Sequence, residues 1–321
     1  MTRVAAVDLG TNSTRLLVAD VVDGRVEEVD RQLTITRLGE GVDARRRLLP
    51  VAIARVRNCL SDYRRLAEAL GAERVLAIGT SAVRDAENGE AFLGEIEWSY
   101  GFETRLLSGD DEALLTFRGV ATGRDVEPGT LVLDVGGGST ELIEGGPEGV
   151  RFHTSLELGS VRMTERFLPS DPPSRDEVSS CSGAVGWLLA EHVPDDVRYA
   201  VRAAVGVAGS VTTLAALDLE LDQYDRERVH GHRLAAEAVD DQLARLAGLP
   251  LAERRKVPAL EPERAPVIVA GAVIVREVLR HFGLEALEAS ERDILHGTAL
   301  AAGELPEREE GAAPPGAYTC C

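Results

Sequence analysis

The chain has 321 residues, of which 44% are hydrophobic and 28% are charged, so its composition excludes a fibrous or wholly disordered protein. Lysine and arginine total 35 against 54 acidic residues, which gives a formal net charge of −19. This balance argues against nucleic acid and anionic membranes as partners, and at first sight against a phosphate-rich substrate, because polyanions are bound by clustered cationic side chains.

An internal repeat opens the chain and recurs near its middle. Residues Val7–Leu17 match Leu133–Ile143 at an offset of 126, with identities at the Asp, the first Gly, the Ser, the Thr and a Leu. In each copy an apolar strand runs into a Gly/Asn/Ser turn and out into a second apolar stretch, which predicts a β-hairpin. We therefore expect two similar halves, residues 1–125 and 126–303.

Further elements are predicted between and after the hairpins. In chain order they are a helix over Pro50–Leu70 that ends at Gly71, a buried strand over Val75–Ile78, a helix over Asp110–Val120, a junction over 123–129, a strand over Val201–Val207, a helix that begins over Thr212–Leu217, and a helix or strand-helix unit over Ile268–Arg280. Residues 304–321 are rich in Pro, Gly and Glu and are predicted to be a disordered tail.

Four cysteines without C-x-x-C spacing indicate a reduced, cytoplasmic compartment. The N-terminus lacks the pattern of a signal peptide, and the longest uncharged apolar run, Ala265–Val275, is too short to cross a bilayer.

The two repeated turns have the chemistry of phosphate sites. Glycine lets backbone N–H groups approach an anion closely, and Ser or Thr hydroxyls add donors. A single turn of this kind is more often an ordinary hairpin turn. Two copies that repeat Asp, Gly, Ser and Thr in order favour two phosphate-binding loops, with Asp8 and Asp134 near the phosphates as groups that hold Mg²⁺ through water.

The segments Ala6–Leu16 and Leu133–Glu141 resemble the two phosphate motifs of the Ppx/GppA family, the exopolyphosphatases and guanosine pentaphosphate phosphatases of the actin/hexokinase/heat-shock ATPase superfamily. Further segments agree in order, namely Arg37–Asp43, Thr80–Asn88, Ser108–Ala113, Val207–Leu217 and Arg264–Glu277. The resemblance implies an α/β fold with two similar actin-like, ribonuclease H-like domains and an interdomain cleft, in a short two-domain form.

The resemblance also implies roles for single residues. Glu112 matches the family's catalytic glutamate, which deprotonates the water that attacks the terminal phosphorus. Without the motif, a Glu in an Asp-Asp-Glu run is usually on a solvated helix face. Asp110 and Asp111 are expected to raise the pKa of Glu112 by like-charge repulsion.

Other roles divide between arginines and carboxylates. Arg15 is expected to clamp phosphate bidentately, while Glu141, at the matching position of the second repeat, serves water or Mg²⁺ together with Asp134. Arg84 resembles the family's phosphate-gripping arginine; a structural ion pair with Asp85 or Glu87 is its alternative.

The loop Gly206–Thr212 resembles the superfamily's third phosphate or nucleoside loop, although Ala208 and Ser210 depart from the commoner Gly-Gly-Thr; an ordinary strand-to-helix turn is the alternative. The predicted catalytic residues are Glu112, Glu141 and Asp134; the predicted phosphate-binding residues are Asn12, Ser13, Arg15, Arg84, Gly136, Gly137, Gly138, Ser139, Gly209 and Ser210; the predicted metal ligands are Asp8, Asp134 and Glu141.

The resulting hypothesis is an exopolyphosphatase that removes the terminal phosphate of inorganic polyphosphate with Mg²⁺, Glu112 being the general base. The alternative is hydrolysis of guanosine pentaphosphate, and the further classes are a small sugar kinase and a non-catalytic sensor of alarmone or polyphosphate. A homodimer is left open. The first half carries 17 Arg against 21 acidic residues and the rest 18 basic against 33, so the −19 excludes broad electrostatic capture but not a local arginine site.

Overall fold

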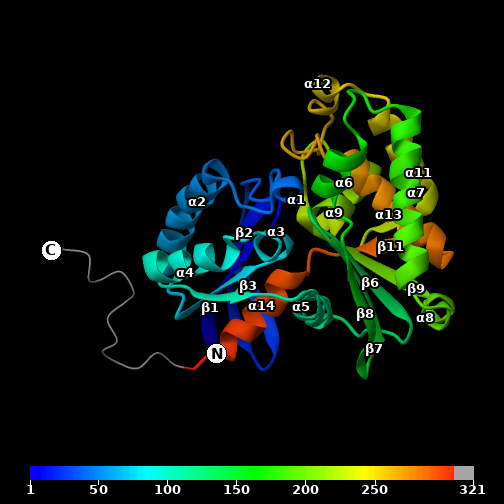
Figure 1. The fold of residues 1–321 in the computed structure, drawn as a ribbon. Coiled ribbons are helices and arrows are strands. Elements are labelled where there is room, and N and C mark those ends of the chain that lie inside the picture. Colours follow the sequence, from blue (N-terminus) through cyan, green and yellow to red (C-terminus); the bar gives the residue numbers. More distant parts are fainter. Residues whose placement is uncertain (307–321) are drawn as a thin grey trace. The chain divides into compact units, whose positions relative to one another are not determined.

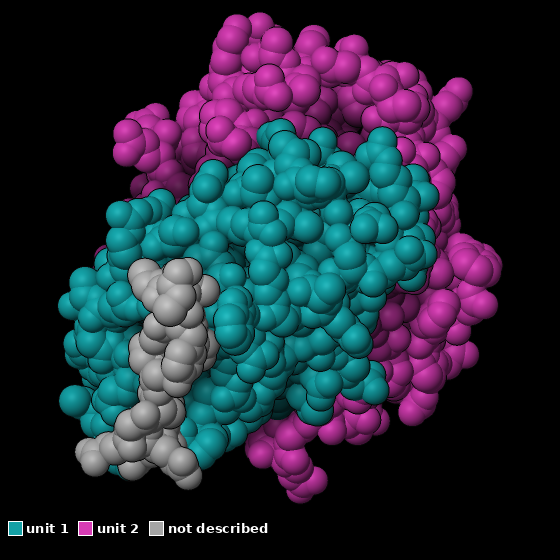
Figure 2. All heavy atoms as spheres, turned by 60° about the vertical axis from the view of Figure 1, so that its left-hand side comes forward, with its two compact units in different colours: residues 1–124, 294–321 teal, residues 125–293 magenta. Residues whose placement is uncertain are grey.

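The structure, a computed structural model, describes residues 1–306, so most of the tail predicted to be disordered lies outside the described residues. The chain divides into two compact units (Figures 1 and 2). Unit 1 consists of Met1–Arg124 together with the chain from Ile294 onward, and unit 2 consists of Asp125–Asp293.

A five-stranded mixed sheet forms the centre of unit 1, in the order β3-β2-β1-β4-β5. Its strands are β1 (Thr2–Leu9), β2 (Ser13–Val22), β3 (Arg25–Ile35), β4 (Arg74–Gly79) and β5 (Glu103–Leu106). The first three strands are antiparallel, as the predicted hairpin requires, and β4 and β5 run parallel to β1. Successive residues of β1 alternate between two cores, because helices cover both faces of the sheet.

The helices of unit 1 are α1 (Val42–Arg45), α2 (Pro50–Ala69), α3 (Ser81–Arg84), α4 (Gly89–Tyr100), α5 (Gly109–Ala121) and α14 (Ile294–Gly303). Helix α2 matches the helix predicted from Pro50, whose missing N–H costs nothing in the first turn. Helix α5 matches the helix predicted from Asp110.

The predicted division placed residues 294–303 in the second half, and this is wrong. Helix α14 packs against β1, β2, β4 and α5 of unit 1 (Figure 1). Leu295 and Ala299 are fully buried in the same core as Val4 and Ala6. The sequence carries only the signal of a buried helix, because the partner of an apolar face is not encoded in its periodicity.

Unit 2 is built on a six-stranded sheet in the order β10-β11-β9-β6-β7-β8. The strands are β6 (Thr130–Val135), β7 (Thr140–Gly146), β8 (Gly149–Leu156), β9 (Ala203–Val207), β10 (Arg233–Ala235) and β11 (Ala286–Ala289). Strands β6 to β8 are antiparallel, and β9 and β11 continue the sheet in parallel with β6, as β4 and β5 do beside β1. This shared topology confirms the predicted α/β fold of two similar halves.

The helices of unit 2 are α6 (Ser160–Phe167), α7 (Arg175–His192), α8 (Asp195–Ala200), α9 (Ala208–Asp218), α10 (Arg226–Val229), α11 (Ala236–Ala247), α12 (Leu251–Arg254) and α13 (Ile268–Phe282). The stretch predicted to be either a helix or a strand-helix unit is a single helix, α13. This helix lies in the centre of the core of unit 2. Helix α9 begins four residues before Thr212. Across residues 1–306, no helix has the length and apolar character needed to cross a membrane.

Candidate active site

Asp8 and Arg15 lie directly opposite each other on β1 and β2 of unit 1. The Nε and Nη2 atoms of Arg15 donate to Oδ2 of Asp8 at 2.9 and 2.7 Å, so the predicted phosphate clamp and the predicted metal ligand form an ion pair. The turn between the strands is tight. The N–H of Gly10 donates to the carbonyl of Ser13 at 3.0 Å, and a Cβ at Gly10 would lie 2.9 Å from that oxygen.

The N-terminus of α5 fixes the position of Glu112. Ser108 is the N-cap and forms a capping box with Asp111, in which the Asp111 N–H donates to the Ser108 hydroxyl at 3.1 Å. Glu112 follows in the first turn and is 7% exposed, so it is not on a solvated helix face. Nη1 of Arg84 donates to Oε2 of Glu112 and to the carbonyl of Leu107, both at 2.9 Å.

Burial raises the pKa of Glu112 from its ordinary value of 4.5 to about 7. Arg84 and Arg15 oppose this shift, and the negative charge of Asp8 adds to it. The expected direction is confirmed, but the leading cause is burial, and neither Asp110 nor Asp111 is among the main causes of the shift.

The surroundings of Glu112 suit a general base. A carboxylate with a pKa near 7 is half deprotonated at neutral pH and still basic enough to accept a proton from a polarised water. Arg84, which was expected to grip phosphate or to pair with Asp85 or Glu87, holds one carboxylate oxygen of Glu112; its contact with phosphate stays a prediction. Unit 1 thus brings together Asp8, Arg15, Arg84 and Glu112.

Asp134 and Glu141 of unit 2 occupy directly opposed positions on β6 and β7. Both are buried, with 7% and 1% of their surface exposed. The Ser155 hydroxyl on β8 donates to Oε1 of Glu141 at 2.7 Å and so orients that carboxylate. Like charges at opposed positions repel, so a cation beside the pair would relieve this repulsion.

The second repeated turn connects these two strands. The N–H of Gly136 donates to the carbonyl of Ser139 at 3.1 Å, which reproduces the bond between Gly10 and Ser13. A Cβ at Gly136 would lie 3.1 Å from the Ser139 oxygen. The repeat in sequence is therefore a repeat in backbone geometry, and it places Gly137, Gly138 and Ser139 at the tip of the hairpin.

The third predicted loop ends β9 and begins α9. Ala208 has φ +64°, the left-handed conformation in which the family's glycine is unstrained and an alanine is not. The guanidinium of Arg264 lies against Gly209, where a Cβ would be 1.5 Å from Nη1. Ser210 is buried, and a Cβ at Gly271 would lie 2.5 Å from its hydroxyl.

Four side chains beside the predicted site residues, one in unit 1 and three in unit 2, were not singled out by the sequence. The Ser81 hydroxyl hydrogen-bonds Thr11 at 2.8 Å beside the first turn, and Ser155 orients Glu141. Arg264 covers Gly209, and the buried Arg162 donates to the carbonyl of Gly138 at 2.7 Å. Their partners lie 14 to 70 residues away in sequence, beyond the reach of a local pattern.

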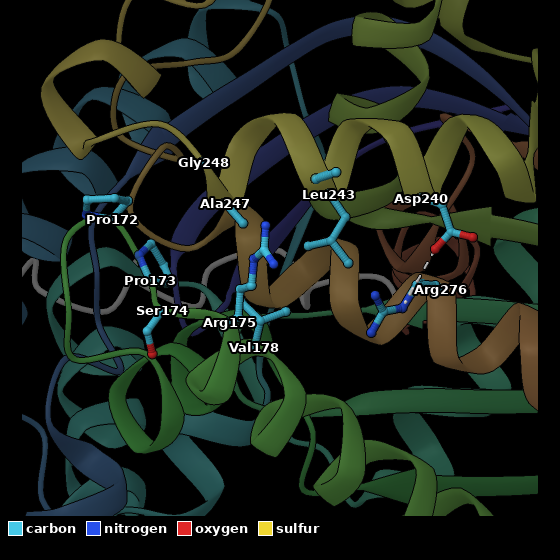
Figure 3. A pocket seen from close by; sticks show the side chains of 11 residues that line it. Pro172, Pro173, Ser174, Arg175, Val178, Asp240, Leu243, Ala247, Gly248 and Arg276 are labelled. Carbon is cyan, nitrogen blue, oxygen red and sulfur yellow. Dashed lines mark ion pairs between the residues drawn. The ribbon is translucent and has the colours of Figure 1, made fainter.

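A separate pocket of about 740 Å³ lies in unit 2 between α7, α11 and α13 (Figure 3). Its lining mixes apolar side chains with the charged Arg175, Asp240 and Arg276. Nη2 of Arg276 bonds the Ser182 hydroxyl, and its Nε lies 3.9 Å from Oδ1 of Asp240. No predicted site residue lines this pocket in the described chain, so it lies outside the candidate active site.

The chain is similar to known proteins over most of its length. Exopolyphosphatase 2 of Mycobacterium tuberculosis is 40% identical over 315 residues, which cover 94% of this chain and 98% of the relative. A crystal structure of an exopolyphosphatase-like protein matches with a TM-score of 0.88 at 34% identity, and covers 94% of this chain and 99% of that one. An Aquifex aeolicus member of the Ppx/GppA family matches with a TM-score of 0.80 at 32% identity, with 94% and 97% covered.

The model of the Ppx/GppA phosphatase family matches residues 17–302, which is most of the chain. The resemblance seen in the sequence motifs is thereby confirmed. The chain belongs to the Ppx/GppA phosphatase family and is a phosphoanhydride hydrolase.

Proposed function

We propose that this enzyme is an exopolyphosphatase, which releases the terminal phosphate of inorganic polyphosphate as orthophosphate. The observation that carries the proposal is Glu112, a buried carboxylate with a pKa of about 7 that Arg84 holds in one orientation. Relatives at 40% and 30% identity that bear the name exopolyphosphatase support polyphosphate as the substrate.

In the proposed reaction Glu112 accepts a proton from water as its oxygen attacks the terminal phosphorus. A new P–O bond forms, the bridging P–O bond breaks, and the electron pair of that bond leaves with the shortened polyphosphate. Orthophosphate is the other product. Arg84 keeps Glu112 oriented for this transfer, and the burial of Glu112 sets its basicity.

The carboxylates of unit 2 fit a bound Mg²⁺. Mg²⁺ is usually held by one or two carboxylates together with substrate phosphate oxygens, and it does not need a cage of protein ligands. Asp134 and Glu141 supply two opposed, buried carboxylates, and Ser155 orients one of them. When bound, Mg²⁺ would neutralise charge on the phosphate oxygens. Asp8 was predicted as a third ligand; its ion pair with Arg15 gives it a role in orienting that arginine.

Phosphate recognition is proposed to come from backbone N–H groups and from the predicted phosphate-binding arginines, Arg15 and Arg84. The turns that contain Asn12 and Ser13 in unit 1, and Gly136 to Ser139 in unit 2, carry the donors, and Gly209 and Ser210 at the start of α9 add a third set. This mode of binding is compatible with a net charge of −19, because it depends on local geometry instead of the overall field.

The test is a Mg²⁺-dependent phosphate-release assay that compares short and long polyphosphate, guanosine pentaphosphate and ATP. The proposal expects polyphosphate to have the highest kcat/KM and EDTA to abolish turnover. A higher kcat/KM for guanosine pentaphosphate would transfer the assignment to that substrate. Phosphate transfer to an added sugar would indicate a kinase, and binding without Mg²⁺-dependent turnover would indicate a sensor.

A further inference from the structure

Three carbonyl groups of the turn between β6 and β7 accept hydrogen bonds from one short segment. The N–H of Ser160 donates to Gly136 O at 2.9 Å, and the N–H groups of Val161 and Arg162 donate to Gly137 O at 2.9 and 3.1 Å. The third carbonyl, that of Gly138, accepts from Nε of Arg162 at 2.7 Å. The first turn of α6 therefore binds the turn through three consecutive carbonyls.

These bonds fix the direction of the turn's N–H groups. In a trans peptide the C=O of one residue and the N–H of the next point in opposite directions. The N–H groups of Gly137, Gly138 and Ser139 must then point away from α6. Among the hydrogen bonds of residues 1–306, none has one of these three N–H groups as its donor. Three adjacent donors that point to one side form a nest for an anion.

Unit 1 repeats the arrangement with other residues. The segment after β3 donates to the first turn: the N–H of Gly39 donates to Thr11 O at 2.8 Å, and the N–H groups of Thr36 and Arg37 donate to Asn12 O. By the same peptide geometry the N–H groups of Asn12 and Ser13 point away from that segment. In both units the chain that follows the third strand thus binds the turn on its carbonyl side, opposite to the N–H groups.

In both units the segment that donates to the turn lies so close to it that a side chain at its glycine would collide with the turn. A Cβ at Gly159 would lie 2.2 Å from Gly137 O, and one at Gly39 would lie 2.3 Å from the Thr11 methyl group. Unit 2 adds Arg162, which is 6% exposed and 3.8 Å from Glu157. No side chain has the matching role in the described bonds of the first turn.

We propose that residues 159–162 are a positioning clamp for the second phosphate turn, and that Arg162 is a positioning residue, which orients the Gly137, Gly138 and Ser139 N–H groups without touching substrate. The inference rests on the proposed function, since it names what holds the phosphate donors in place. It also assigns the N-terminus of α6 a structural role: its N–H groups bind the turn's carbonyls and are not left for an anion.

The test measures kinetics and binding with inorganic tripolyphosphate in Arg162→Met and Arg162→Lys. We expect Arg162→Met to raise KM by about tenfold, which is the worth of one hydrogen bond of about 1.4 kcal/mol, while kcat changes less than about threefold. Arg162→Lys keeps a charged nitrogen that can donate a hydrogen bond, and it should recover part of the affinity. Calorimetry with tripolyphosphate in a Glu112→Gln background separates binding from turnover.

Arg254→Met is the matched control. Arg254 is also a buried arginine of unit 2, 3% exposed, and donates only to backbone carbonyls, those of Leu246, Leu249 and Ala265. The Arg254→Met variant should lower the melting temperature as much as Arg162→Met does, and its KM should equal that of the wild type. An unchanged KM in Arg162→Met, with the same loss of stability as the control, would show a merely structural residue and overturn the clamp.

A measurement without ligand distinguishes failure of the clamp from failure of the proposed function. The ¹⁵N order parameters of Gly137, Gly138 and Ser139 report how rigidly their N–H groups are held. They should fall in Arg162→Met and not in Arg254→Met, and wild-type values in Arg162→Met overturn the clamp whatever binds. If wild-type protein does not bind tripolyphosphate, the proposed function fails while the clamp is judged on the order parameters.

Discussion

Glu112 combines burial with an acidic side chain, and its protonation state links activity to pH. We expect Glu112→Gln to lower kcat by about 10²- to 10⁴-fold, the usual contribution of a general base, with substrate binding retained. In the wild type, kcat/KM should rise about tenfold per pH unit below pH 7 and level off above it, since the pKa of Glu112 is about 7. Steady-state phosphate release from pH 5 to 9 measures both, and a flat profile contradicts the assignment.

Stability should depend on pH in the opposite sense to activity. The folded-state pKa of Glu112 lies above the unfolded value of 4.5, so the folded state binds more protons between pH 4.5 and 7. The free energy of unfolding of the wild type, relative to Glu112→Gln, should therefore fall as pH rises through this window, by on the order of 3 kcal/mol. Urea denaturation of both proteins at pH 5 and pH 8 tests the sign.

Ala208 has a conformation that costs an L-residue about 1–2 kcal/mol, at the point where β9 turns into α9. We expect Ala208→Gly to raise the free energy of unfolding by up to about 1 kcal/mol, because relief of strain exceeds the entropy that glycine adds to the unfolded state. Ala54→Gly is the control: Ala54 is exposed within α2, and this change should cost about 1 kcal/mol. If both substitutions lowered the free energy of unfolding by the same amount, Ala208 would not be strained.

At the scale of elements, two helices begin with a serine capping box, but only one of them contains a predicted catalytic residue. Ser108 caps α5 and Ser174 caps α7, each in a capping box with the residue three positions on. Replacing either serine by Ala should cost about 1 kcal/mol of stability. Only Ser108→Ala should also lower kcat/KM, by about tenfold, because the first turn of α5 positions Glu112.

Thermal unfolding and phosphate release on the two variants give the comparison. A kcat/KM that falls equally in Ser108→Ala and Ser174→Ala would mean that the loss reflects general destabilisation. Wild-type kcat/KM in Ser108→Ala would mean that Glu112 does not depend on the cap of its helix.

Elements with a local signature were predictable, and contacts between elements were not. The hairpins followed from the repeat of Asp, Gly, Ser and Thr, and the helix from Pro50 followed from its periodicity and the Gly71 stop. The burial of Glu112 was not readable, because an acidic run is typical of a solvated face and only tertiary packing encloses it. Arg162 was missed because its acceptor, Gly138 O, lies 24 residues earlier. The cytoplasmic location and the homodimer stay predictions.

At the scale of the whole molecule, the chain returns to its first unit after building its second. Helix α14, from the end of the described chain, buries Leu295, Ala299 and Leu300 against the same core as Val4 and Ala6 of β1. Unit 1 therefore cannot complete its core from residues 1–124 alone, and its folding requires a contact between residues about 290 positions apart.

Gly297 sets how closely this late helix approaches α5, and it gives the test of the closure. A Cβ at Gly297 would lie 1.9 Å from the carbonyl of Leu115, so Gly297→Ala should force α14 outward and cost about 1–3 kcal/mol, as overpacking of a core does. Gly94 lies in α4 with nothing within 4 Å of its Cβ position, so Gly94→Ala should instead stabilise unit 1 by about 0.5–1 kcal/mol. In calorimetric unfolding, the two substitutions should change the free energy of unfolding in opposite directions if α14 is part of unit 1. If both substitutions raise it, α14 does not pack on α5.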